Sequence, residues 1–134
     1  VLAGGGQALR YMFKPSRDGA SVDCWASGIG SKNTHYSSGV GNHFYYLLAQ
    51  GAVAPAGYSY TPAQLVCNGN TALTAIGRAK AEKIWYRALT VYMVSSTNYA
   101  GARVATLNAA RDLYGLGGTE YKAVAAAWSA VNVN

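Results

Sequence analysis

Few side chains in this sequence could carry out chemistry: two histidines, two cysteines and five carboxylates among 134 residues. A hydrolytic zinc site needs three protein ligands and a nearby general base. His35 and His43 stand eight residues apart, the motif H-E-x-x-H is absent, and no carboxylate lies near either histidine in the sequence. We therefore expect no metal site built from this chain alone. A Ser-His-Asp triad remains compatible with the composition, although the chain has no G-x-S-x-G turn to present a nucleophilic serine.

Cys24 and Cys67 are the only cysteines, and neither belongs to a C-x-x-C pair. A zinc finger or a thioredoxin-like redox site therefore has no support. Both cysteines stand in stretches rich in Gly, Ser and Asn, which are typical of surface loops. Two cysteines in exposed loops favour a disulfide in an exported protein, with two free thiols as the alternative. By loop-closure entropy, such a bridge would stabilise the fold by about 4 kcal/mol.

Length and composition indicate one folded domain. A chain of 134 residues has the usual length of a single domain, and 51% hydrophobic against 12% charged residues argues against disorder. No apolar run approaches the roughly 20 residues of a membrane-spanning helix, so we expect no membrane partner. The net charge is +6. Lys80, Lys83 and Arg87 fall opposite the apolar side of one expected helix, the usual place of solubilising charge, so we expect no nucleic-acid partner either.

Four segments have the apolar spacing of an α-helix, and together they predict an all-α fold. They run from Ser37 or Ser38, whose hydroxyls could cap the helix, to Gly51; from about 76 to 93; from Asn98, a good N-cap, to Gly115; and onward from Thr119. Their expected buried faces are Val40, Phe44, Leu47 and Leu48; Ala81, Ile84, Trp85, Ala88, Leu89 and Tyr92; Tyr99, Ala102, Ala110, Leu113 and Tyr114; and Tyr121, Val124, Ala125, Trp128 and Val131.

Long irregular stretches rich in Gly, Tyr and Ser separate these segments. They cover residues 16–34 and 51–71, and residues 1–7 are expected to be a loose N-terminal tail of a single helical domain that spans 1–134. Loops of this length in a compact domain are usually functional or belong to an interface. The chain starts at Val1 with neither a charged nor an apolar leader segment. We therefore expect it to be a processed piece of a longer, secreted product.

Five sequence blocks, spread over the whole chain, carry a resemblance to a known family. They are residues 8–12 (ALRYM), 35–40 (HYSSGV), 42–49 (NHFYYLLA), 77–90 (GRAKAEKIWYRALT) and 109–115 (AARDLYG). In this order they resemble the C-terminal domain of thermolysin-like neutral zinc metallopeptidases of the secreted bacterial type. The resemblance implies a helical lobe that forms one wall of the peptide cleft in a two-lobed endopeptidase.

The resemblance also implies roles for individual residues. His35 matches the family histidine that donates a hydrogen bond to the oxyanion formed when zinc-bound water attacks the peptide carbonyl, the kind of donor whose removal costs about 2.7–4 kcal/mol. Arg10 matches the arginine that binds a substrate carbonyl, and Leu9 the apolar wall of the adjoining specificity pocket. Asn33 stands where many members have an Asp that accepts the other ring N–H of the histidine. An amide can accept that bond but lacks the charge that favours imidazolium. His43 has no counterpart, and we expect its side chain to be partly exposed.

The family's zinc ligands and most of its calcium sites belong to an N-terminal lobe that precedes the segment seen here. We therefore expect no cofactor in this chain, zinc and calcium in that lobe, a peptide or protein substrate, an extracellular location, and no peptide hydrolysis by this chain alone. The alternative is a stand-alone, non-catalytic module that keeps the fold of the lobe. Such a module would bind protein or peptide through the apolar surface of the exposed cleft wall.

Overall fold

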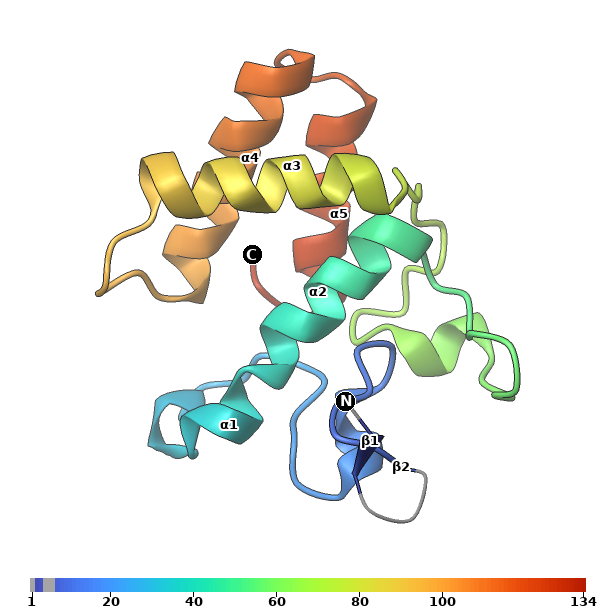
Figure 1. Cartoon of the computed structure of the whole chain (residues 1–134). Helices are drawn as coiled ribbons and strands as arrows, with labels where there is room; N and C mark the ends of the chain where they lie inside the picture. The colour runs from blue at the N-terminus through green and yellow to red at the C-terminus, as the bar shows by residue number, and fades with distance from the viewer. Residues whose placement is uncertain (1, 4–6) are drawn as a thin grey trace.

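The computed structural model describes residues 2–3 and 7–134 (Figure 1). Within these ranges the fold is mainly α-helical, as predicted, with four longer helices and a short one. They are α1 (Thr34–Ser37), α2 (Gly39–Gln50), α3 (Arg78–Arg87), α4 (Tyr99–Tyr114) and α5 (Thr119–Ala130).

Short turns and a small strand pair make up the other regular structure of the described residues. The 3-10 turns are η1 (Pro15–Asp18), η2 (Ile29–Ser31) and η3 (Pro62–Leu65), and a π-helical turn, η4 (Ala88–Tyr92), continues α3. Strand β1 (Leu2–Ala3) pairs antiparallel with β2 (Gln7–Ala8). The rest of the expected loose tail, residues 1 and 4–6, lies outside the described residues.

The core lies between the four longer helices α2, α3, α4 and α5. Figure 1 shows α3 lying across the antiparallel pair of α4 and α5. Helix α2 runs obliquely and contacts both α5 and α3. Phe44 of α2 stacks on Trp128 of α5 with ring centroids 3.7 Å apart. Trp128 Nε1 donates a hydrogen bond to Thr106 Oγ1 of α4 at 2.7 Å. All three side chains are fully buried, so the indole N–H has its polar partner inside the apolar core.

Helical periodicity predicted most of the buried faces. The whole predicted face of α2 is buried, and so are Ala81, Ile84 and Ala88 on the second predicted segment. Two residues contradict the prediction: Leu89 is 48% exposed and Leu113 is 40% exposed. Leu89 lies in η4, where Met93 N–H donates to Ala88 O across a wider π turn. The α-helical spacing therefore no longer predicts which way the Leu89 side chain points. Leu113 lies in the last turn of α4, next to the loop that leads to α5.

The helix ends follow the sequence signals with one exception. Asn98 Oδ1 accepts the N–H of Gly101 at 2.9 Å, which confirms the predicted N-cap of α4. Gly51 and Gly115 end α2 and α4 at positive φ angles of 74° and 93°. The Ser38 hydroxyl, however, does not cap α2. It donates to His35 O at 3.1 Å, because a helical turn already precedes α2.

A disulfide between Cys24 and Cys67 joins the two long irregular stretches, which confirms the pairing expected from the sequence. Two backbone hydrogen bonds fasten the same region to the end of α5. Trp25 N–H donates to Val131 O at 2.8 Å, and Cys67 N–H donates to Ala130 O at 2.7 Å. The irregular chain is therefore held to the helical core at both sides of the bridge.

Two of the basic residues of α3 form ion pairs with the helices that α3 crosses. Lys80 pairs with Glu120 of α5, and Arg87 pairs with Asp112 of α4 at 2.8 Å. Asp112 also accepts a hydrogen bond from the hydroxyl of Tyr92 in η4. The Tyr92 hydroxyl and the Arg87 guanidinium lower the pKa of Asp112 to about 2. These polar contacts bind α3 and the π turn to the layer beneath them.

Candidate functional site

His35 lies on α1, a helix of only four residues. The sequence prediction that it precedes the first helix is therefore wrong, because the chain becomes helical at Thr34. Asn33 is the N-cap: its Oδ1 accepts the backbone N–H of His35 at 2.9 Å. The observed bond of Asn33 thus goes to the backbone of His35, where we had expected it to go to the ring. The bond from the His35 backbone N–H to Asn33 caps the start of α1 and fixes this turn. The imidazole itself is exposed.

The junction between α1 and α2 is tightly packed against the N-terminal part of the chain. Gly39, the first residue of α2, lies so close to the carbonyl of Val22 that a Cβ there would be 2.4 Å from the oxygen. Val22 N–H in turn donates to Tyr36 O at 3.3 Å. A glycine at this position is therefore required by the close approach of two backbones, and it brings residue 22 directly beside α1.

Leu9 and Arg10 emerge from a buried aromatic anchor. Tyr11 and Phe13, which follow them, are buried, with ring centroids 6.1 Å apart. Leu9 is 50% exposed, and Arg10 is partly exposed and donates from Nη1 to Leu9 O at 2.8 Å. Burial acts to raise the pKa of Asp18, but hydrogen bonds from Ser21 and Ala20, with a smaller contribution from the charge of Arg10, lower it overall. Both side chains can thus reach a ligand at the surface.

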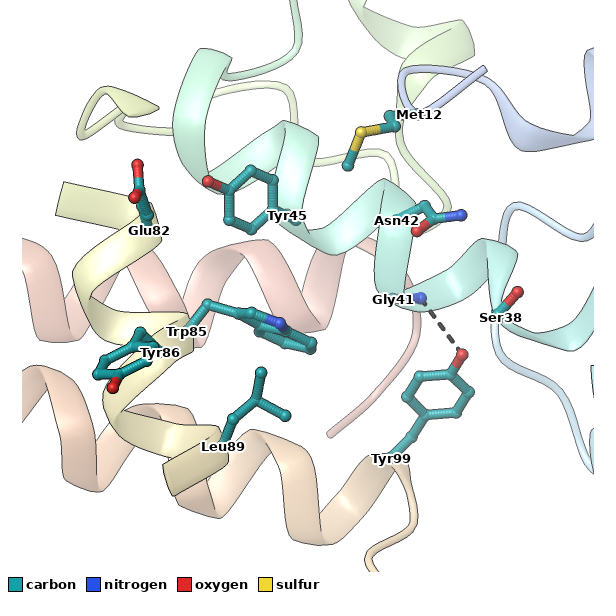
Figure 2. Close-up of a pocket in the computed structure, with 10 residues that line it drawn as sticks. All are labelled: Met12, Ser38, Gly41, Asn42, Tyr45, Glu82, Trp85, Tyr86, Leu89 and Tyr99. Carbon is teal, nitrogen blue, oxygen red and sulfur yellow. Dashed lines mark hydrogen bonds between the residues drawn. The ribbon is translucent and has the colours of Figure 1, made fainter. Parts of the chain in front are cut away.

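An apolar groove of about 580 Å³ runs along α2 and α3 (Figure 2). Its lining residues come mainly from α2, α3 and the start of α4: Met12, Ser38, Gly41, Asn42, Tyr45, Glu82, Trp85, Tyr86, Leu89 and Tyr99. None of Leu9, Arg10, Asn33 or His35 lines it. Met12 and Ser38 do, and each lies within three residues of a predicted site residue, so both predicted segments border the same groove.

The sequence prediction missed this groove. It assigned Leu89 to the buried face of one helix, whereas the side chain of Leu89 is 48% exposed. It assigned no role to Tyr86, which is 69% exposed. The signal that could have revealed the groove is the excess of large apolar and aromatic residues on α3, more than one helix face can bury. Exposed groups of this kind mark surfaces that contact a ligand or another protein body.

His43 is buried, with 1% of its surface exposed, so the prediction of a partly exposed side chain is wrong. Its Nδ1 lies 2.9 Å from Asp23 O and its Nε2 lies 2.9 Å from Leu65 O. Burial lowers the pKa of His43, and the two carbonyls oppose this effect only in part. The sequence held a signal: His43 is three residues after Val40 and four before Leu47, which places it on the apolar face.

The side chains of the described residues do not supply a metal centre. Within residues 2–3 and 7–134, no three His, Cys, Asp or Glu side chains lie close enough together to hold an ion. The two thiols are joined in the disulfide, and Asp23 is bound to Lys14 and Ser16. The described residues therefore do not fit zinc or calcium. In the same part of the chain, none of the helices has the length and apolar character needed to cross a lipid bilayer.

Comparison with known proteins identifies the domain. Residues 2–133 match the sequence model of the family described as thermolysin metallopeptidase, alpha-helical domain. The transglutaminase-activating metalloprotease of Streptomyces mobaraensis is 47% identical over 132 residues, which are 98% of this chain and 17% of that protein. The bacillolysin of Bacillus cereus is 36% identical over 132 residues, 96% of this chain and 21% of that protein. This chain thus spans about a fifth of the length of the relatives it matches. It belongs to the thermolysin metallopeptidase family and is the C-terminal α-helical domain of that fold.

Proposed function

We propose that this chain is the substrate-facing lobe of a secreted thermolysin-like endopeptidase, which supplies hydrogen-bond donors to the peptide but no metal ligand. The observation that carries the proposal is the exposed imidazole of His35, presented on a capped turn within a domain that matches the family over residues 2–133. The Cys24–Cys67 disulfide supports an extracellular location, since such bridges persist in oxidising compartments.

In this proposal His35 donates a hydrogen bond to the negative charge that develops on the peptide carbonyl oxygen as the bond is attacked. A donor works best there when its position is fixed before the reaction. The backbone of α1 meets this condition, because Asn33 caps the turn at one end and the Ser38 hydroxyl bonds to His35 O at the other. The role of Asn33 is then to hold the turn that carries the imidazole.

Arg10 and Leu9 would bind the substrate beside the reacting bond. Arg10 uses a single Nη1 donor on Leu9 O, and a guanidinium has five N–H donors, so it can bind a substrate carbonyl without giving up that contact. The exposed side chain of Leu9 offers apolar surface to the neighbouring substrate side chain. The charge, the donor and the apolar wall thus lie on adjacent residues.

The rest of the enzyme would provide zinc, calcium and the opposite wall of the cleft. The relatives are about five times as long as this chain, and one of them is a transglutaminase-activating metalloprotease. The apolar groove between α2 and α3 exposes Leu89 and Tyr86, which is surface suited to packing against such a second lobe. The same groove favours the second candidate function, a non-catalytic module that binds protein or peptide there. In that case His35 would contribute nothing to peptide hydrolysis.

Kinetics of the full-length, zinc-loaded protein on a fluorogenic peptide test the proposal. We expect His35→Ala to lower kcat about 100- to 1,000-fold with KM little changed, as for other oxyanion donors. Arg10→Ala should lower kcat/KM about 10- to 100-fold, mainly through KM, because it removes a charged hydrogen bond worth about 1.5–3 kcal/mol. Lys32→Ala, an exposed neighbour of His35, is the matched control and should change neither constant. Full kcat in His35→Ala would refute the assignment.

A further inference from the structure

The hydroxyl of Tyr99 joins two helices that lie far from it in the sequence. Tyr99 is the first residue of α4, and its hydroxyl donates to Ser37 O, at the end of α1, at 2.8 Å. The same oxygen accepts the N–H of Gly41, in the first turn of α2, at 3.3 Å. Figure 2 shows this second bond as the link between Tyr99 and Gly41. One side-chain oxygen thus holds both sides of the α1–α2 junction.

The junction needs such a partner. The last carbonyls of one helix and the first N–H groups of the next have no partner within their own helix. The Tyr99 hydroxyl satisfies one group of each kind, because it can donate and accept at once. Burial raises the pKa of Tyr99, so the hydroxyl keeps its proton and remains a donor at neutral pH.

The turn that carries His35 also depends on outside support. A helix of four residues is too short to be stable by itself. Its described backbone links to the body of the domain are the bond from Val22 N–H to Tyr36 O, at 3.3 Å, and the shorter bond from Tyr99. The Tyr99 ring lies 6.1 Å from the fully buried Trp128 ring, centroid to centroid. The hydroxyl therefore transmits the rigidity of the core to α1.

We propose that Tyr99 is a positioning residue for His35: its hydroxyl fixes the α1–α2 junction and thereby sets the place of the imidazole relative to the reacting carbonyl. This inference rests on the proposed function of His35. Tyr99 itself touches neither the substrate nor the reacting atoms in this role. A shift of about 1 Å in a group that acts on the transition state can cost about 100-fold in rate, so a loosened turn should be visible in kcat.

A double-mutant cycle in the full-length, zinc-loaded enzyme tests the inference. Tyr99→Phe removes the hydroxyl and keeps the ring, and we expect it to lower kcat about tenfold with KM changed less than about twofold. In the His35→Ala background the same substitution should have no further effect, because Tyr99 acts only through His35. Replacement of Tyr99 by 4-aminophenylalanine, which restores a donor at the same place, should recover most of the lost kcat.

Tyr46→Phe is the matched control. The Tyr46 hydroxyl also donates to a backbone carbonyl, that of Val53, at 2.8 Å, but at the opposite end of α2. Its loss should leave kcat unchanged, and both Phe variants should keep the melting temperature within a few degrees of the parent. This comparison separates positioning of His35 from the general loss of a tyrosine hydrogen bond.

The outcomes distinguish the two proposals. If His35→Ala keeps full kcat, the proposed function itself fails. If His35→Ala is slow but Tyr99→Phe is as fast as the parent, the positioning role is refuted and the role of His35 stands. The positioning role is also refuted if Tyr99→Phe slows the His35→Ala enzyme by the same factor as the parent, or if 4-aminophenylalanine restores no activity.

Discussion

Replacing Gly39 by alanine tests how closely the α1–α2 junction is packed. The added Cβ would lie 2.4 Å from Val22 O and 3.0 Å from the Cβ of Pro15, whereas ordinary contacts begin at 3.4 Å. The oxygen must therefore retreat by about 1 Å. It cannot do so freely, because the N–H of the same residue is bonded to Tyr36 O at 3.3 Å. We expect the substitution to push the N-terminal segment away from α1.

The expected cost of Gly39→Ala has three parts. Forcing an extra carbon into a packed site costs about 1–3 kcal/mol, and loss of the Val22–Tyr36 hydrogen bond costs about 1 kcal/mol. Alanine recovers up to about 1 kcal/mol through its higher helix propensity. The free energy of unfolding should therefore fall by about 2 kcal/mol. With a urea m-value of about 2 kcal/mol/M, the unfolding midpoint should fall by about 1 M.

Gly41→Ala is the control, since it lies two residues further along the same helix. Its Cβ would meet only the Tyr99 side chain, 3.6 Å from Cε1 and 3.7 Å from the hydroxyl oxygen, which are ordinary contacts. We expect this variant to gain up to about 1 kcal/mol. Urea unfolding followed by tryptophan fluorescence measures both midpoints. The two substitutions should move the midpoint in opposite directions, and a Gly39→Ala midpoint equal to or above that of the parent would refute the reasoning.

Two further predictions concern buried polar groups. Thr106→Val leaves the indole N–H of Trp128 without its acceptor and should lower the free energy of unfolding by about 1–3 kcal/mol. The control Thr90→Val removes an exposed hydroxyl bonded to Tyr86 O and should change the free energy of unfolding by less than about 0.5 kcal/mol. Equal losses for the two variants in urea unfolding would contradict the prediction. Burial lowers the pKa of His43 in the folded chain, so the unfolded chain binds a proton at this imidazole more readily. The stability that neutral His43 contributes is therefore fully present above about pH 6.5 and declines as the pH falls below that value. Unfolding free energies between pH 7 and 5 should therefore fall more steeply for the parent than for His43→Gln, and equal slopes would count against this account.

The longer helices could be predicted from the sequence because each buries an apolar stripe. Val40, Phe44 and Leu47 recur at helical spacing and lie in the core, and Asn98 caps α4 through its side chain. The rule fails where the backbone leaves the α-helical spacing, as at Leu89 in the π turn. Helical spacing places His43 on the apolar face of α2, but it does not reveal the polar partners of the ring. The two ring nitrogens lie 2.9 Å from Asp23 O and Leu65 O, which come from distant loops that no local pattern indicates.

The candidate site was less accessible to such reasoning. The four-residue helix α1 is too short to show a period, and it is held by residues far away in the sequence, notably Tyr99. Roles for Leu9, Arg10 and His35 came from the resemblance to a family, since their types and spacing alone indicate no reaction. The structure shows Leu9 and His35 exposed and Arg10 partly so, and their roles stay a prediction that the kinetics above test.

The attachment of the irregular stretches to the end of α5 uses main-chain atoms. The N–H groups of residues 25 and 67 bond to the carbonyls of residues 131 and 130. Every amino acid except proline carries that N–H, so these two attachments do not depend on which side chain stands at either position. Substitutions at positions other than Cys24 and Cys67 can therefore change the surface of these loops without breaking either main-chain attachment.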